Sequence, residues 1–228
     1  MARWHVYPGL DELTERAAIA IVGGADQALA SRGEFHIVLA GGNTPRGIYA
    51  RLADMGVGDD RWQIWFGDER YLAPGHAERN ETMARDSWLA ESAIPGKNIH
   101  PVPHGPTPEA AASVYAELLA PIRQFDLVLL GMGPDGHTAS LFPGHDVGES
   151  ADAADVLVVR DAPKPPPVRI SMSAHRLSRA RQVLFMVTGE AKRDAVSHWR
   201  HGQSLPAALV TPPTGVDVFM DEGAAPGF

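Results

Sequence analysis

One histidine in a glycine-rich segment is the strongest candidate for proton-transfer chemistry. His137 follows Asp135 by two residues, and both lie just after residues 125–130, an apolar run with the length of a strand. A neutral imidazole, with an unperturbed pKa near ~6.5, can take a proton from water at physiological pH. The carboxylate could orient the ring and stabilise its charged form. A histidine that only satisfies a turn carbonyl is the alternative that these residues leave open.

A second segment, residues 41–45 (Gly-Gly-Asn-Thr-Pro), has the composition of an anion-binding turn. It joins a predicted strand to a predicted helix, and the free N–H groups and positive dipole end of a helix start favour an anion such as phosphate. The alternative is a tight turn with Thr44 as the helix cap and Pro45 at the first helical position.

Two cationic side chains, Lys192 and Arg169, could bind such an anion. Lys192 falls in the first turn of a helix predicted to begin near residues 188–190, where a cation is disfavoured by about 0.3–1 kcal/mol unless a negative group is near. A bound phosphate is the functional partner; the alternatives are an ion pair with Glu190 or a lysine that is simply exposed. Arg169 follows a loop with four prolines, residues 162–167, and is a second cation that could reach the same anion.

A third polar cluster, Asp68, Glu69 and Arg70, directly follows residues 63–66, another predicted strand. A solvated loop is the usual reading of such a run. Its position at a strand end favours a functional role, because sites of parallel α/β sheets combine residues from several strand ends.

Several other chemistries are disfavoured. Gly131, Gly133 and Gly136 match the dinucleotide-binding glycine pattern, but Pro134 interrupts it and no convincing acidic residue follows at the expected distance.

The chain has no cysteine, and its histidine pairs lack a third ligand for zinc, so we expect no metal and no cofactor. Ser140 lacks the flanking glycines of a nucleophile elbow and is interpreted either as structural or as a residue that supports those of the site.

Composition points to a globular protein. The 228 residues are 44% hydrophobic and 21% charged, with a formal net charge of -8, which argues against a nucleic-acid partner. No run is long enough to span a membrane and no signal-like segment opens the chain, so we expect a cytoplasmic protein, a monomer or a weak homo-oligomer.

The elements that must position these residues alternate between strand and helix. Apolar spacing predicts a first helix from residue 10 to about 24, a helix after Pro45, and a helix capped by Thr107 with Pro108 at its first position. Strands are predicted at residues 35–40, 63–66, 125–130, 156–159, 168–172 and 183–187. This order predicts one α/β domain over residues 1–228, a mostly parallel, Rossmann-like sheet with helices on both faces.

The polar segments, taken together and in register, resemble the 6-phosphogluconolactonase family over nearly the whole chain. The resemblance rests on residues 41–45, 68–70, Asn80, 130–143, 169–171 and 188–192. It implies hydrolysis of a phosphosugar lactone, 6-phosphogluconolactone, to 6-phosphogluconate in the oxidative pentose phosphate pathway. His137 would be the base, aided by Asp135, with Arg70 at the sugar end. The phosphate and substrate contacts it implies are Gly41, Gly42, Asn43, Thr44, Asp68, Arg169 and Lys192.

The same superfamily includes glucosamine-6-phosphate deaminase, which carries a glutamate shortly after its histidine. Here no acid follows until Asp146, so lactonase chemistry is favoured over an isomerase or deaminase. A non-catalytic module that binds sugar phosphates is the alternative outside enzymes. Two positions depart from the lactonase pattern, where serine is usual: Ala40 loses at most one phosphate contact, and Arg79 adds a cation near the expected substrate.

Overall fold

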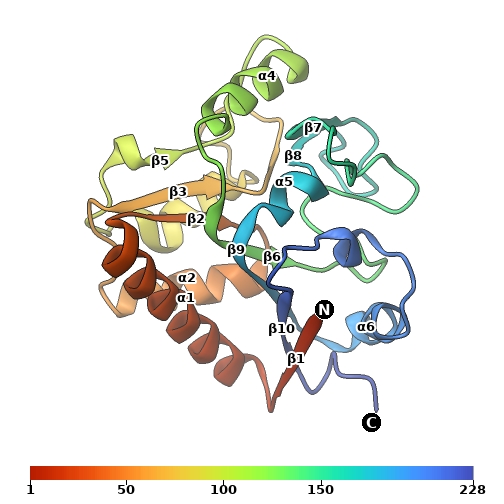
Figure 1. The fold of residues 1–228 in the computed structure, drawn as a ribbon. Helices are drawn as coiled ribbons and strands as arrows, with labels where there is room; N and C mark the ends of the chain where they lie inside the picture. The colour runs from red at the N-terminus through yellow and green to blue at the C-terminus, as the bar shows by residue number, and fades with distance from the viewer. Residues whose placement is uncertain (228) are drawn as a thin grey trace.

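The computed structural model describes residues 1–227, and a seven-stranded sheet forms its centre (Figure 1). The strand order is β1-β10-β9-β6-β2-β3-β5, and every neighbouring pair is parallel. The predicted parallel sheet is therefore confirmed. Its strands are β1 (Ala2–Tyr7), β2 (Phe35–Leu39), β3 (Trp62–Phe66), β5 (Ile99–His100), β6 (Phe125–Gly131), β9 (Ala180–Val187) and β10 (Val216–Asp221).

Helices cover both faces of this sheet. On one face, Gly24 of α1 lies against Gln182 of β9, while on the other Trp199 of α6 packs edge-on against Phe185, with ring centroids 4.9 Å apart. Residues 182 and 185 of one strand point to opposite faces because side chains alternate along a strand. The helices are α1 (Leu10–Arg32), α2 (Asn43–Asp54), α3 (Asn80–Ala84), α4 (Pro108–Leu119), α5 (Ala174–Ser178) and α6 (Arg193–Arg200).

The central strand β6 explains why the core forms here. Every residue from Phe125 to Leu130 is buried, as expected for a parallel strand covered on both faces. The expected cap of α4 is also present, since Thr107 accepts a hydrogen bond from the backbone N–H of Ala110 at 3.1 Å. Both predictions from local sequence are confirmed.

A separate antiparallel sheet corrects the strand prediction. Its order is β4-β8-β7, with β4 (Asp68–Arg70), β7 (Val156–Val159) and β8 (Arg169–Met172). The prediction that the last two runs belong to the mostly parallel sheet is wrong, and so is the alternative that residues 68–70 form a solvated loop. The connection between β7 and β8 has no helix and is too short for a parallel crossover, which needs a dozen or more residues. The two runs therefore pair as a hairpin.

Three strands of the main sheet are not predicted from the sequence: β1, the two-residue β5, and β10. β1 and β10 pair at its edge, with Trp4 opposite Val218, and lie side by side in Figure 1. Most of β1 is only partly buried, so its apolar alternation is weak. Pairing with a strand more than 200 residues away in sequence stabilises it, and no local pattern reports such a partner.

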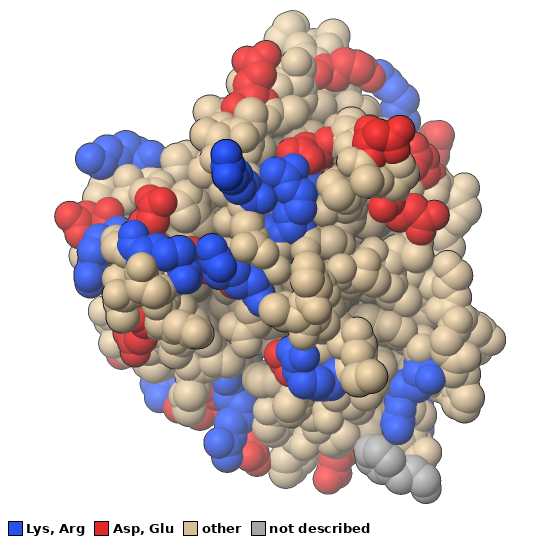
Figure 2. Space-filling model, viewed as in Figure 1, with Lys and Arg blue, Asp and Glu red and all other residues tan. Residues whose placement is uncertain are grey.

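Charge on the visible surface is local. On the face drawn in Figure 2, Lys and Arg side chains gather in small groups, with acidic side chains and wide neutral areas between them. Within residues 1–227, no helix is long and apolar enough to cross a membrane.

Candidate active site

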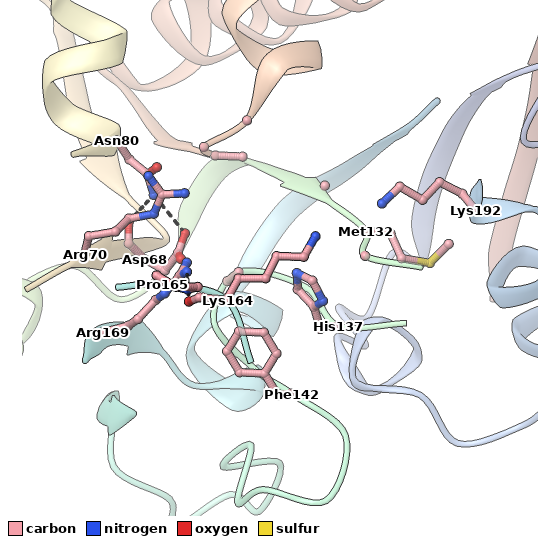
Figure 3. A pocket seen from close by; sticks show the side chains of 16 residues that line it. Asp68, Arg70, Asn80, Met132, His137, Phe142, Lys164, Pro165, Arg169 and Lys192 are labelled. Carbon is pink, nitrogen blue, oxygen red and sulfur yellow. Dashed lines mark hydrogen bonds between the residues drawn. The ribbon is translucent and has the colours of Figure 1, made fainter. Parts of the chain in front are cut away.

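A cavity of about 320 Å³ opens at the carboxyl ends of the parallel strands. Segments that follow β2, β3, β6 and β9 all contribute to its wall, which is where α/β sheets place their ligands. The predicted site residues that the structure brings to this wall are Gly41, Gly42, Asp68, Arg70, His137, Arg169 and Lys192. The polar clusters that are far apart in sequence thus share one cavity (Figure 3).

His137 lines this wall and is hydrogen-bonded to Asp135, which does not itself line the cavity. Nδ1 of His137 lies 2.5 Å from Oδ1 of Asp135, and the His137 side chain is 22% exposed. A carboxylate can only accept, so Nδ1 carries the proton and the lone pair of the neutral ring lies on Nε2. Burial acts to raise the pKa of Asp135, but its hydrogen bond and charge interaction with His137 outweigh this and hold the pKa below its usual range. The pair can therefore accept a proton at Nε2.

Glycine is required at the turn that shapes this pair. A Cβ on Gly133 would lie 2.0 Å from Nδ1 of His137, and Gly136 has a φ of +82°. The turn is closed by a hydrogen bond from the N–H of Gly133 to the carbonyl of His137 at 2.8 Å. No helix follows within residues 132–155, so the glycine pattern here serves the histidine and not a dinucleotide.

Asp68 is held in place from two sides. The hydroxyl of Ser140 donates to its Oδ2 at 2.5 Å, and Nδ2 of Asn80 donates to its Oδ1 at 3.2 Å and to its carbonyl at 2.9 Å. Ser140 is fully buried, in agreement with its predicted structural role. Asp68 thus faces the cavity with both carboxylate oxygens already bonded.

The glycine loop reaches the cavity through its first two residues only. Gly42, with a φ of +110°, is the N-cap of α2, so the alternative with Thr44 as cap is wrong. Asn43 and Thr44 do not line the cavity, and the hydroxyl of Thr44 is bonded to that of Thr188 at 2.7 Å. This bond joins the glycine loop to the segment that leads to Lys192.

The side chain of Lys192 forms no ion pair with the helix that it precedes. It ends a short 3-10 turn, Glu190–Lys192, directly before α6. Glu190, which we named as an alternative partner, instead pairs with Arg193 at 3.1 Å. Burial lowers the pKa of Lys192, the positive charge of Lys164 lowers it further, and Asp135 opposes both effects. Lys164 was not among the predicted site residues, although it lines the cavity.

Arg169 lies beside Arg70 and not beside Lys192. Its guanidinium donates to the carbonyls of Pro166 at 3.1 Å and Lys164 at 2.9 Å. Burial is the main cause that lowers its pKa; Asp68 opposes this effect and Arg70 adds to it. Arg70 donates through Nη1 to the carbonyl of Glu78, and its Nε is buried without a protein partner among the described residues.

Arg79 does not face the substrate cavity, which corrects the expectation of an extra cation there. It is 2% exposed and donates to the carbonyls of Leu72 and Val102 at 2.8 Å. Its Nε lies 3.7 Å from Oε2 of Glu69. Burial raises the pKa of Glu69 to about 7, against hydrogen bonds from three backbone N–H groups and the charge of Arg79.

Comparison with known proteins gives a consistent result. Residues 8–219 match the family described as glucosamine-6-phosphate isomerases/6-phosphogluconolactonase. The 6-phosphogluconolactonase of Synechocystis sp. is 35% identical over 225 residues, which cover 93% of this chain and 92% of that protein. The one from Mycobacterium leprae is 41% identical, with 79% and 80% covered. The crystal structure of the Thermotoga maritima 6-phosphogluconolactonase has a TM-score of 0.86 at 26% identity, with 97% and 99% covered.

The fold and the cavity define an α/β enzyme with a histidine–aspartate pair among cations at the carboxyl edge of its sheet. The chain belongs to the glucosamine-6-phosphate isomerase/6-phosphogluconolactonase family.

Proposed function

We propose that the chain, as a single domain over residues 1–228, hydrolyses 6-phospho-D-glucono-1,5-lactone to 6-phospho-D-gluconate. The observation that carries this proposal is the His137–Asp135 pair, which leaves Nε2 free in a cavity that also holds cations. Relatives that share most of the chain are named 6-phosphogluconolactonase. The proposed reaction uses water and needs neither metal nor cofactor.

The proposed step begins with a water molecule between His137 and the lactone carbonyl. Nε2 takes a proton from the water as its oxygen bonds to C1, and Asp135 stabilises the imidazolium that forms. The C1–O ring bond then breaks, and the ring oxygen receives the proton that His137 holds. The product is an open-chain acid. General-base help of this kind is worth ~10²–10⁴-fold in rate.

The remaining residues position the substrate in this proposal. The backbone N–H groups of Gly41 and Gly42, together with Lys192, are assigned to the phosphate, because a helix start and a cation both favour an anion. Asn43, Thr44 and Arg169 were predicted to contact the same phosphate, and the bonds described above indicate a supporting role for Thr44 and Arg169. Arg70 is assigned to the sugar end, next to Asp68, where it could stabilise charge on the carbonyl oxygen.

A deaminase or isomerase reaction has no support from the residues near His137. The position where an acid would be needed is occupied by Phe142 and its neighbours, and the Phe142 ring packs 4.8 Å from the His137 ring between centroids. A cytoplasmic location is also part of the proposal, since a phosphorylated substrate crosses a bilayer only at high cost.

The test is a lactonase assay on freshly generated substrate, with spontaneous hydrolysis subtracted. Acid release that the wild type accelerates, with no ammonia released from glucosamine 6-phosphate, is the expected result. Ammonia release or aldose–ketose exchange would favour the other branch of the family. Tight binding of a sugar phosphate in calorimetry without turnover would favour a binding module.

A further inference from the structure

Lysine is rare in this chain, and its distribution points to the cavity. Of the 20 Lys and Arg residues, the only lysines are Lys97, Lys164 and Lys192. Two of these three line the same cavity, and the third is exposed in a short 3-10 turn between β3 and β5. Arginine supplies the positive charge almost everywhere else, so the two cavity lysines are set apart by type as well as by position.

The loop that carries Lys164 is held rigidly. Arg169 bonds two of its carbonyls, those of Lys164 and Pro166, and the N–H of Ala162 donates to the carbonyl of Pro167 at 3.0 Å. Three consecutive prolines, residues 165–167, restrict the backbone further. Lys164 is therefore presented from a fixed point, although its side chain is exposed.

The side chain of Lys164 extends into the cavity above the ring of His137, and its ammonium group points toward the side where Lys192 lies (Figure 3). The two ammonium groups are near enough for the charge of Lys164 to lower the pKa of Lys192, the second cause after burial. Like charges in one cavity repel unless an anion lies between them.

The carboxylates at this wall are already engaged. Asp135 is bonded to His137, and Asp68 is bonded to Ser140 and Asn80. Among residues 1–227, no hydrogen bond or ion pair joins either lysine side chain to a protein group. Asp135 acts on Lys192 only through its charge, so both ammonium groups are free to bond to an anion that enters the cavity.

We infer that Lys164 and Lys192 hold the substrate phosphate between them, and that Arg169 serves this site by fixing the Lys164 loop. This inference rests on the proposed lactonase function and adds the second cation of its phosphate site. A phosphate dianion accepts from two ammonium groups at once, which removes their mutual repulsion. Specificity for a phosphorylated lactone over the bare sugar lactone then depends on both lysines.

The kinetic test uses Lys164→Met, Lys192→Met and, as matched control, Lys97→Met. Each is assayed on the phosphorylated lactone and on unphosphorylated glucono-1,5-lactone. Removing one charge-assisted contact to phosphate should raise KM for the phosphorylated substrate ~10–100-fold. The loss on the bare lactone should be at least about tenfold smaller, and Lys97→Met should match the wild type on both. Equal losses of Lys164→Met on both substrates, or no loss, would overturn the inference.

The double variant adds a second criterion. If both lysines bind one phosphate, Lys164→Met combined with Lys192→Met should raise KM by less than the product of the two single effects, because the second removal acts on a contact already weakened. Lys164→Arg should recover most of the lost affinity, since it restores the charge. Independent effects with no recovery by arginine would contradict a shared anion.

A binding measurement separates this inference from the reaction itself. Reductive methylation with ¹³C-formaldehyde keeps the charge of each amine and gives one dimethylammonium NMR signal for each of the three lysines and one for the N-terminal amine. The single variants assign the three lysine signals. Titration with inorganic phosphate should shift the Lys164 and Lys192 signals together and leave the Lys97 signal in place. If the wild type hydrolyses no lactone, the proposed function fails while this titration still decides the phosphate site. A shift of Lys192 alone would exclude Lys164 from it.

Discussion

The two ends of the cavity are built in opposite ways. Around β4, the side chains of Asp68, Glu69 and Asn80 bond to one another or to nearby backbone, so that end is a closed network. At the other end, Nε2 of His137 and the ammonium groups of Lys164 and Lys192 face the cavity without protein partners in the described chain. Apart from Arg70, whose Nε has no protein partner among the described residues, the β4 end is thus a scaffold bonded within the protein, whereas the other end keeps its polar groups free for a ligand.

The largest effect should come from the end of the cavity that carries His137, Lys164 and Lys192. His137→Ala should lower kcat ~10²–10⁴-fold, because the base that takes the water proton is lost. Binding of the product 6-phosphogluconate, measured by calorimetry, should change little, since the phosphate contacts remain. The matched control is His145→Ala, an exposed histidine whose ring lies edge-on to the same Phe142 ring, with centroids 6.0 Å apart. If His137→Ala keeps the full rate after background subtraction, the division into a reactive and a structural end is wrong.

Substitutions at the β4 end should act mainly by lowering the free energy of unfolding. Arg79→Met leaves the buried Glu69 carboxylate without its cation, and breaking a buried pair typically costs about 3–5 kcal/mol. Unfolding in urea at pH 8, where the carboxylate is ionised, measures this cost. Arg16→Met is the matched control, because Arg16 pairs with Glu12 at 3.4 Å on the surface and such pairs contribute about 0–1 kcal/mol. Equal effects of the two substitutions would show that Glu69 does not need Arg79.

A smaller loss of stability should follow substitution of Gly41, which lies against Asn80. A Cβ on Gly41 would lie 2.1 Å from Oδ1 of Asn80, so Gly41→Ala must displace the side chain that holds Asp68. Overpacking of this kind costs about 1–3 kcal/mol in unfolding free energy. Gly131→Ala is a close control, since Gly131 lines the same cavity and its added Cβ would meet nothing within 4 Å. If both glycines tolerate alanine equally, Asn80 is not packed against the loop as described.

The sequence indicated the free end better than the scaffold end, and the reason is physical. Glycine turns after apolar strands are local signals, so His137, Asp135 and the Gly41–Gly42 turn could be located from their neighbours. The antiparallel pairing of β4 with β8 and the burial of Arg79 depend on contacts between residues about 20 to 100 positions apart. Lys164 was missed because a proline loop is usually an ordinary surface connection, and only the bonds from Arg169 turn it toward the cavity.

The pH dependence of the free energy of unfolding tests the buried network around Glu69. Burial raises the pKa of Glu69 from 4.5 to about 7, so the folded protein holds a proton that the unfolded chain has already released between these values. Stability should therefore fall as pH rises from about 4.5 to 7, by on the order of 3 kcal/mol. The carboxylates of Asp135 and Asp217 have lowered pKa values and change stability only at more acidic pH. His100, whose pKa is lowered by burial, acts in the opposite direction as pH rises toward 6.5.

Comparison with Glu69→Gln isolates the Glu69 contribution from that of the histidines. The variant cannot ionise, and its one amide oxygen can replace either Oε1, which accepts from the N–H groups of Arg70 and Asn80, or Oε2, which accepts from the N–H of Glu81, but not both. Urea unfolding at several pH values should show the fall in the wild type and a flatter or rising profile in the variant. Parallel profiles would mean that Glu69 is ionised throughout, as its backbone donors and Arg79 favour. In that case the closed end of the cavity is a charged network over the whole range, and its ion pair with Arg79 is permanent.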